Sequence, residues 1–513
     1  SPFRSSELVE TASTGADLAI GDFAFFLFCF FDAVGRTMMM DTLSACSVLI
    51  FGLVFALTPI VSSKKIVYFP FFNAFSHHAI GTRLGRELAE RGHEVLIINS
   101  HIYAEEFKTR ANHTGVELLT FKHTLSAAEW EEYSQKFLTL DLISQTKTFH
   151  YLNNLGCRDL FKDETIKLRI ADADMFVVDD FCKCGAIAKD VFPNVEHLAT
   201  VVPTSFFDPY VLPAYGGINN LALVPQLGSG LQSKMTFLDA MANTLISALH
   251  YSLIYFVIDP LLQELRAELG LTGTHDETMA KVGVVIVGVS WAFEFPRPMP
   301  PVVKLVGPFL ATPAQKLPLH LEEYVSSSNS PNGVVYASLG TIAIISESKL
   351  KQLLQAFANC KHNFLFKLPP GFEDVALPEN VKGFSWLPQN DILGHDNVVG
   401  FFSHGGLNGA SEAMFHGVPV IGFPMMTDQW DNLIRLKARG MAEYVRDDNW
   451  SVGDITNMII KVVSTPSYTA NARKLSKIVR DPIYPPAPEA AANYLEYAMR
   501  HDGAKHEIIP LIN

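Results

Sequence analysis

The chain has 513 residues, of which 48% are hydrophobic and 18% are charged, and its formal net charge at pH 7 is -13. This length exceeds one ordinary domain and predicts roughly two to four domains. The negative charge argues against a nucleic-acid-binding protein, which would carry a basic surface, so we expect no nucleic acid among the partners.

The N-terminal region carries processing signals. The chain begins with a serine, so we expect translation to start at Met38, Met39 or Met40 and residues 1–39 to be upstream translation. Residues 40–63 combine an apolar stretch with a proline and small residues, which is the pattern of a secretory signal peptide. An uncleaved N-terminal anchor is the alternative.

Four cysteines follow the predicted signal segment. They are too few for a disulfide-rich scaffold, and Cys182 and Cys184 have neither the spacing nor the partners of a zinc site. We therefore expect Cys157, Cys182, Cys184 and Cys360 to be buried or free thiols.

Apolar strand-like runs alternate with helical patterns in the first half of the chain, where residues 81–92 form the first predicted helix. Continuous Val, Ile and Phe runs are typical of a parallel sheet with helices on both faces. Residues 206–280 are long, helical and apolar, and we interpret them as a lid or pocket region. The predicted strands are residues 65–72, 94–100, 116–121, 174–180, 197–205 and 284–291.

A second alternating series follows a proline-rich linker at residues 296–318. Its predicted strands are residues 333–340, 364–368, 381–387, 398–402 and 418–424. The sequence therefore predicts an α/β fold with two doubly wound, Rossmann-like domains that face a cleft, where ligands bind outside the carboxyl ends of the strands. The domains would span residues 64–295 and 319–480, with a C-terminal helix and tail at 481–513.

A small polar cluster follows the strand at residues 398–402. Ser403 and His404 stand at the carboxyl end of this strand, and Gly405 and Gly406 allow backbone amides to approach an anion closely. A helix starts directly afterwards, and its free N–H groups and dipole favour a phosphate there. An ordinary tight strand-to-helix turn is the alternative interpretation.

Further polar residues suggest a nucleotide rather than a free phosphate. Asn408 and Glu412 are four residues apart and share one helix face, where a carboxylate can accept hydrogen bonds from ribose hydroxyls. Trp386 offers an indole on which a base can stack. Asp428 and Gln429 follow the next strand and lie at the same edge of the predicted sheet.

Residues 386–432 closely resemble the donor-binding segment of the UDP-glycosyltransferase family, which includes the animal UDP-glucuronosyltransferases. Residues 338–341 resemble the second diphosphate loop of that family. The resemblance implies the GT-B type of two-domain fold and a UDP-sugar as co-substrate, with no permanently bound cofactor and no metal. One departure is Trp430, where many animal members have proline.

The resemblance also implies a role for each matching position. Trp386 would stack on uracil, and Gln389 would assist at the base and ribose. Glu412 would hold the ribose hydroxyls, and Asp428 and Gln429 would bind the sugar. The residues around the diphosphate would be Ser338, Ser403, His404, Gly406, Asn408 and Gly409.

An acceptor hydroxyl needs a base, and two adjacent histidines follow the first predicted strand. In the family, the catalytic histidine stands fourteen residues before the arginine of an R-G-H-E sequence, and counting back from Arg91 gives His77. His78 is the lesser candidate, and His93 is expected to be structural.

A carboxylate that steadies the histidine is expected at the end of the strand at residues 174–180. The family places it five positions after the aspartate that opens this strand, which gives Asp179, and Asp180 would then cap a helix. Asp172 and Asp174 match a D-x-D metal motif, but they lie at the start of the strand, so we reject them as metal ligands.

The implied function is transfer of glucuronate or glucose from a UDP-sugar to the hydroxyl of a small lipophilic acceptor, with inversion. A non-catalytic UDP-sugar-binding protein and a sugar-nucleotide epimerase are the alternatives. The family implies the endoplasmic reticulum, in the lumen or at the membrane. Animal members usually continue into a membrane-spanning helix that is not present in this sequence, so either the sequence is truncated or this member is lumenal. Membrane association and a homo-oligomer both stay open.

Overall fold

The computed structural model describes residues 63–110, 112–137, 140–203, 220–326, 332–340, 345–425, 428–445 and 449–507. The predicted upstream segment 1–39 and the signal segment 40–62 lie outside these residues. Residues 63–513 cluster as one compact unit, and the following description concerns the described part of that unit.

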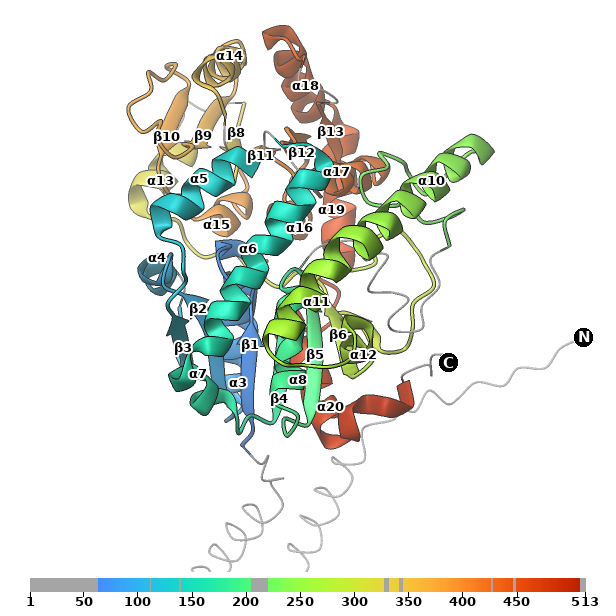
Figure 1. Cartoon of the computed structure of the whole chain (residues 1–513). Coiled ribbons are helices and arrows are strands. Elements are labelled where there is room, and N and C mark those ends of the chain that lie inside the picture. The colour runs from blue at the N-terminus through green and yellow to red at the C-terminus, as the bar shows by residue number, and fades with distance from the viewer. Residues whose placement is uncertain are drawn as a thin grey trace, which may run out of the picture. The chain divides into compact units, whose positions relative to one another are not determined.

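The first half of this unit is built on a seven-stranded parallel sheet in the order β3-β2-β1-β4-β5-β6-β7 (Figure 1). Four of its strands, β1, β4, β5 and β6, are buried along their whole length, which explains their continuous apolar sequences. The strands are β1 Lys65–Phe69, β2 Glu94–Ser100, β3 Val116–Phe121, β4 Met175–Asp179, β5 His197–Val202, β6 Val282–Val287 and β7 Val303–Leu305.

Helices cover both faces of this sheet (Figure 1). The helices before β5 are α3 Phe75–Glu90, α4 Ala104–Arg110, α5 Ala127–Phe137, α6 Leu142–Lys162, α7 Glu164–Ile170, the 3-10 helix η1 Lys183–Ile187 and α8 Ala188–Val191. Those after β5 are α10 Phe237–Leu253, the π-helix η2 Ile254–Ile258, α11 Asp259–Glu268 and α12 His275–Met279.

The predicted lid region, residues 206–280, contains a continuous helix from Phe237 to Glu268, and residues 204–219 lie outside the described part. By length and composition this 32-residue helix could cross a membrane, and 33% of its most apolar window is buried. Phe237, Tyr255 and Phe256 are among its exposed side chains, so much of its apolar face does not pack against the sheet.

The second half is built on a six-stranded parallel sheet in the order β10-β9-β8-β11-β12-β13. Its strands are β8 Val334–Ser338, β9 Asn363–Lys367, β10 Val381–Phe384, β11 Val398–Ser403, β12 Val420–Gly422 and β13 Ala442–Tyr444. The helices are α13 Leu319–Val325, α14 Glu347–Ala358, α15 Gln389–Leu393, α16 Leu407–His416, α17 Gln429–Ala438, α18 Val452–Ser464, α19 Pro466–Val479, α20 Ala487–Arg500 and the 3-10 helix η3 Asp502–Glu507.

Both sheets have the strand order of a doubly wound fold, which confirms the predicted fold class. In each sheet the chain winds outward from one strand and then reverses. The reversal lies between β1 and β4 in the first sheet and between β8 and β11 in the second. Ligands in such folds bind at the carboxyl ends of the strands at this switch point.

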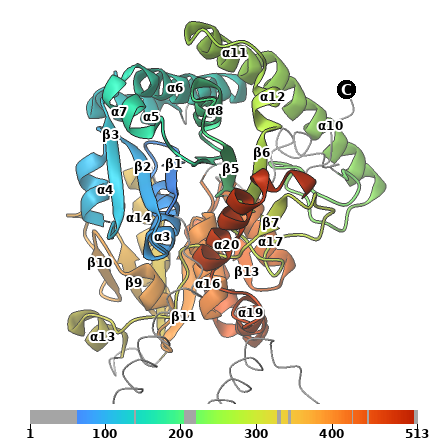
Figure 2. The same ribbon diagram turned by 90° about the horizontal axis from the view of Figure 1, so that it is seen from below.

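Two differences from the sequence prediction concern α3 and the predicted linker, whereas the C-terminal helix predicted within residues 481–513 is present as α20. Helix α3 begins at Phe75, well before the predicted residue 81. Within the predicted linker, Val303–Leu305 forms β7 beside β6. Helix α20 returns to the first sheet and lies beside α3 (Figure 2), where Arg91 donates from Nη1 to Asn493 Oδ1 at 2.8 Å.

Candidate active site

A histidine and an aspartate meet at the switch point of the first sheet. His77 lies in the first turn of α3, directly after β1, and Asp179 is the last residue of the neighbouring strand β4. His77 Nδ1 is 2.7 Å from Asp179 Oδ2. The Asp179 side chain is fully buried, whereas the His77 side chain is 15% exposed. We call these two residues the dyad.

The contacts of Asp179 determine what the dyad can do. Its Oδ1 accepts a hydrogen bond from the Phe181 N–H at 2.9 Å, so its Oδ2 is left to accept a hydrogen bond from His77 Nδ1. A neutral imidazole that donates from Nδ1 has its lone pair on Nε2. The His77 ring can therefore take a proton at Nε2 as a general base, and Asp179 can steady the imidazolium that forms.

The two neighbouring candidates have other contacts. His78 is fully buried, and its Nε2 is 3.0 Å from His113 Nε2. Burial, and to a lesser extent His113, lowers the pKa of His78 to about 3, so this ring stays neutral inside the fold. Asp180 pairs with Lys183 Nζ at 3.4 Å. The prediction that it caps a helix is wrong, because Cys182 is the N-cap of η1 and no side chain bonds there.

Two phenylalanines contact the His77 ring, and a third packs against both of them. The ring centroids of Phe71 and Phe181 lie 5.5 Å and 5.2 Å from that of His77. Phe149 of α6 stacks on Phe71 at 5.2 Å and contacts Phe181 edge-on at 6.1 Å. All three side chains are half-buried. The polar dyad is therefore bordered by an aromatic and partly accessible surface, which we call the phenylalanine cluster.

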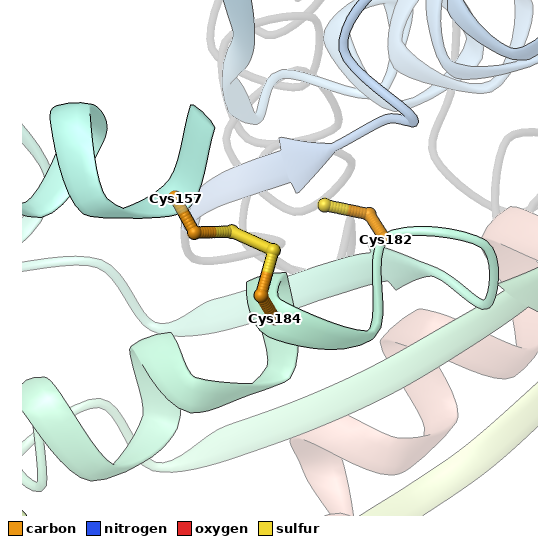
Figure 3. A group of neighbouring side chains, drawn as sticks. All are labelled: Cys157, Cys182 and Cys184. Carbon is orange, nitrogen blue, oxygen red and sulfur yellow. A yellow bond between two sulfur atoms is a disulfide. The ribbon is translucent and has the colours of Figure 1, made fainter. Parts of the chain in front are cut away.

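The cysteines differ from the prediction. Cys157 of α6 and Cys184 of η1 form a disulfide with a Cα–Cα distance of 6.1 Å (Figure 3), so the expectation of thiols is wrong for this pair. Cys182 and Cys360 are free and buried, as expected. The pairing depends on α6 packing against η1, and a separation of 27 residues along the chain does not reveal that contact.

Two serines lie side by side at the switch point of the second sheet. Ser338 ends β8, Ser403 ends β11, and the two residues are partners in the strand pairing. Each hydroxyl accepts a hydrogen bond from the amide two residues ahead: Gly340 N–H to Ser338 Oγ at 3.3 Å and Gly405 N–H to Ser403 Oγ at 3.1 Å. The hydroxyls thereby shape two adjacent turns at the carboxyl edge.

His404 lies between these turns. A Cβ atom at Gly340 would be 2.8 Å from His404 Nε2, and one at Gly406 would be 2.5 Å away, so both positions must lack a side chain. Gly405 has a φ of +87°, which favours glycine as well. Burial lowers the pKa of His404 to about 4, so its ring is neutral near pH 7 and can offer a hydrogen bond but no positive charge.

Helix α16 begins beside His404 at Leu407, directly after the glycines as predicted, and ends before Gly417. Its N-cap is Gly406, and no side chain caps its first turn, where the half-buried Asn408 and the buried Gly409 lie. The helix therefore presents backbone N–H groups and the positive end of its dipole at the edge of the sheet.

Glu412 lies one turn further along α16 and is 7% exposed. Its Oε2 accepts a hydrogen bond from Gln389 Nε2 at 2.5 Å, and Gln389 Oε1 accepts one from the buried Tyr336 hydroxyl at 3.2 Å. Burial raises the pKa of Glu412 to about 7. Trp386, on the loop before α15, is 63% exposed and presents a flat aromatic surface.

Asp428 and Gln429 stand at the start of α17, after β12, at the same edge of the sheet. Gln429 Oε1 accepts a hydrogen bond from the Met425 N–H at 2.8 Å. Asn432 is a residue that the sequence analysis did not select. It is fully buried, and its Nδ2 donates to Gly405 O at 3.0 Å and to Asp428 Oδ2 at 2.8 Å. Its spacing of four residues from Asp428 on one helix was the available signal.

Two other predictions concern the D-x-D pair, Asp172 and Asp174, and the predicted second diphosphate loop. Asp174 accepts hydrogen bonds from Lys64 Nζ at 2.8 Å and from the Lys65 N–H at 2.7 Å, and Asp172 pairs with the Lys65 side chain. The D-x-D pair is thus bound to lysines at the opposite edge of the sheet from the dyad. Thr341, the last residue of the predicted second diphosphate loop, lies outside the described residues.

The described contacts also join the two halves of the chain. Glu294, which is fully buried and follows β6, accepts at Oε1 from Arg435 Nε of α17 at 3.1 Å and from Arg297 Nη2 at 2.8 Å. Asp431 of α17 accepts from the Gly228 N–H at 3.2 Å. The helix that begins with Asp428 and Gln429 is therefore held against residues of the first half.

Comparisons with known proteins find relatives over most of the chain. The model of the family described as "UDP-glucoronosyl and UDP-glucosyl transferase" matches residues 65–508. UDP-glucuronosyltransferase 2B15 of Homo sapiens is 31% identical over 468 residues, which cover 87% of this chain and 86% of that protein. UDP-glucuronosyltransferase 2B7 of Homo sapiens is 30% identical over 441 residues, covering 82% of each chain.

Solved glycosyltransferase structures share the fold. The spinosyn forosaminyltransferase SpnP aligns with a TM-score of 0.60 at 18% sequence identity, covering 86% of this chain and 100% of that chain. Os79 from O. sativa, solved in complex with UDP, aligns with a TM-score of 0.59 at 17% identity over 85% of this chain and 100% of that chain. These identities support a common GT-B fold and no finer conclusion.

Proposed function

Because the chain belongs to the UDP-glucoronosyl and UDP-glucosyl transferase family, we propose that it transfers glucuronate or glucose from a UDP-sugar to the hydroxyl of a small lipophilic acceptor. The observation that carries this proposal is the dyad. A half-buried histidine bonded through Nδ1 to a buried aspartate has the arrangement that a general base requires, at the edge where doubly wound sheets bind ligands.

In the proposed reaction, His77 Nε2 takes the proton of the acceptor hydroxyl. The acceptor oxygen attacks the anomeric carbon from the side opposite UDP, and the bond between that carbon and the diphosphate oxygen breaks. One displacement inverts the configuration, so an α-linked donor gives a β-glycoside. Asp179 stabilises the imidazolium through the 2.7 Å contact.

We assign donor binding to the second sheet. Trp386 stacks on uracil, Gln389 assists at the base and ribose, and Glu412 accepts from the ribose hydroxyls. Asp428 and Gln429 bind the sugar hydroxyls. The diphosphate is held by Ser338, Ser403, His404, Gly406, Asn408 and Gly409. The uncapped N-terminus of α16 and the adjacent serine turns support this assignment, because such amides favour an anion.

We propose that the leaving diphosphate is stabilised without a metal ion. The α16 dipole, its backbone amides and a hydrogen bond from neutral His404 are directed at the edge where the diphosphate would lie. The D-x-D carboxylates are bound to Lys64 and Lys65 instead. Transfer should therefore be unchanged after dialysis against EDTA, and loss of activity that Mg²⁺ or Mn²⁺ restores would contradict this part.

The phenylalanine cluster supports a lipophilic acceptor. Phe71, Phe149 and Phe181 offer partly accessible ring surfaces beside His77, where an apolar acceptor would release water on binding. A hydroxyl group on an acceptor bound in this way would lie next to His77, the proposed base.

We place the protein in the endoplasmic reticulum, in the lumen or at the membrane. The predicted signal segment at residues 40–63 supports entry into the secretory pathway, and the Cys157–Cys184 disulfide supports an oxidising compartment. Protection from added protease in intact microsomes, and the fraction retained after carbonate extraction, would test location and membrane association separately.

The decisive experiment compares UDP-glucose and UDP-glucuronate as donors with a panel of phenols. We expect a β-glycoside from one of them, and His77→Ala should abolish transfer while UDP binding, measured by calorimetry, stays near the wild-type value. Full activity of His77→Ala would refute the base assignment. UDP binding without turnover on any acceptor would refute the transferase proposal itself.

A further inference from the structure

Three cysteine sulfurs lie together beside the turn that carries Asp179. Cys157 and Cys184 form the disulfide between α6 and η1, and Cys182 has a free thiol (Figure 3). The three sulfur atoms all lie within 4.8 Å of one another. The side chains of all three are buried, so no external thiol or oxidant reaches them in the folded protein. Chemistry among the three sulfurs themselves needs no such access.

The free thiol belongs to the turn that positions the dyad. The Cys182 N–H donates to Asp179 O at 2.8 Å, and Cys182 O accepts from the Gly185 N–H at 2.7 Å. The residue between Asp179 and this turn, Phe181, donates its N–H to Asp179 Oδ1 and contacts the His77 ring. A displacement of Cys182 would therefore be transmitted to Asp179 and to the ring that it holds.

We propose that Cys157, Cys182 and Cys184 form a thiol–disulfide exchange site with two disulfide isomers, of which only the Cys157–Cys184 isomer holds Asp179 correctly against His77. The effect on catalysis rests on the proposed transferase function, whereas the exchange itself does not. The site therefore adds a covalent control to the positioning of the dyad.

The bonds, electrons and protons of the exchange balance among the three cysteines. Cys182 loses its proton, and its thiolate attacks the sulfur of Cys157. A Cys182–Cys157 bond forms, the Cys157–Cys184 bond breaks, and Cys184 leaves with the electron pair and takes up a proton. No oxidant or reductant is consumed.

Attack on Cys157 is favoured over attack on Cys184. A Cys182–Cys184 bridge would close across a single residue inside the first turn of η1, and closure of so short and stiff a loop is unfavourable. A Cys182–Cys157 bridge keeps the link to α6 but attaches it two residues closer to Asp179. The second isomer would therefore displace the turn that links Asp179 to Cys182.

The surroundings of Cys182 make exchange slow in the folded protein. Burial and the nearby Asp179 carboxylate raise the pKa of this thiol, and the buried Tyr68 hydroxyl of β1 also faces it. Because the thiolate is the attacking species, the exchange rate should rise by about tenfold per pH unit between pH 7 and pH 9. The isomer present at neutral pH is therefore set mainly while the chain folds.

Peptide mapping without reduction, after alkylation of free thiols, tests the exchange. In the full chain purified under oxidising conditions, Cys184→Ser leaves Cys157 and Cys182, and we expect a Cys157–Cys182 peptide. Cys182→Ser is the matched control and should contain only Cys157–Cys184. If Cys184→Ser does not fold, the wild type incubated at pH 9 should yield the Cys157–Cys182 peptide. Free thiols at both positions, or no such peptide at pH 9, would overturn the proposal.

Coupling to the dyad is measured separately. We expect Cys184→Ser to bind UDP as the wild type does, to show faster amide exchange in residues 175–187, and to lose at least tenfold in kcat. Cys157→Ser, which has no bridge, shows how much of this loss comes from a missing link to α6, and its kcat should exceed that of Cys184→Ser. A bridged Cys184→Ser protein with the kcat and amide exchange of the wild type would refute the coupling. Absence of transfer by the wild type would instead refute the transferase proposal, and the peptide map would still decide the exchange.

Discussion

Substitution of Asp179 by asparagine gives the sharpest test of the dyad. The two carboxylate oxygens have different partners: Oδ1 accepts from the Phe181 N–H at 2.9 Å, and Oδ2 contacts His77 Nδ1 at 2.7 Å. An asparagine amide has one accepting end and one donating end. If its oxygen stays on Phe181, its NH₂ group faces Nδ1 and forces the ring proton onto Nε2, where the base must be free.

The flipped asparagine is no better, because its NH₂ group would then face the Phe181 N–H in a buried contact between two donors. The first orientation disables the base. The second is opposed by the buried contact between donors, and it also lacks the negative charge that steadies the imidazolium. The comparable change in a serine-protease triad lowers kcat by about 10⁴-fold. We expect Asp179→Asn to lower kcat by about 10³–10⁴-fold, which corresponds to about 4–5 kcal/mol of transition-state stabilisation.

The assay measures kcat at saturating UDP-sugar and UDP affinity by calorimetry in the same preparation. Asp180→Asn is the matched control, because it makes the same chemical change in the adjacent residue, whose carboxylate pairs with Lys183. Its kcat should stay within about tenfold of the wild type, although its melting temperature should fall. An Asp179→Asn protein within tenfold of wild-type kcat, or an Asp180→Asn protein with the larger loss, would refute the assignment.

Three further predictions concern donor binding and the contact between the halves. The raised pKa of Glu412 means that burial of its carboxylate opposes folding once pH rises through about 7 and has no such effect below the ordinary glutamate range. Glu412→Gln should therefore raise the melting temperature of the ligand-free protein at pH 8 but not at pH 4.5. Equal shifts of the melting temperature at the two pH values would contradict this. Asn432→Ala removes the buried amide that donates to Gly405 O and to Asp428. It should raise the KM for the UDP-sugar by about tenfold or more, at a kcat that changes less. An unchanged donor KM would exclude this positioning role. Glu294→Gln should lower the free energy of unfolding in urea by about 3 kcal/mol, because it removes the negative charge that pairs with buried arginine. The control is Glu347→Gln at an exposed ion pair, which should change the free energy of unfolding by less than about 1 kcal/mol.

The sequence predicted those parts of the fold that depend on local pattern. The predicted bounds of β2 and β3 match the structure. Parallel strands buried on both faces have long apolar runs, so their positions are visible without knowledge of tertiary contacts. The predicted start of α16 directly after Gly405 and Gly406 also matches the structure, where Gly406 is its N-cap.

The differences arise where distant segments decide the structure. The three-residue strand β7 exists because Val303 and Leu305 pair with β6, and its proline-rich surroundings predicted a linker. The disulfide requires α6 to lie against η1. The start of α3 was missed because its N-cap, Ala74, makes no side-chain capping bond and so gives no sequence signal.

The choice between paired candidates rested on the family resemblance alone, and the structure supplies a physical criterion for it. His77 and His78 are adjacent on α3, so their side chains point about 100° apart around the helix. One reaches the carboxyl edge of β4, where Asp179 lies, and the other enters the core against Phe107 and His113. Asp179 and Asp180 likewise diverge, one toward His77 and one toward Lys183. The same reversal of strand order that brings β1 beside β4 brings β8 beside β11, so one topological rule accounts for both the dyad and the paired serine turns. An aspartate placed at the end of β5 instead, away from the reversal, would not restore activity to Asp179→Asn, and recovery of transfer in such a double variant would show that the switch point does not determine the site.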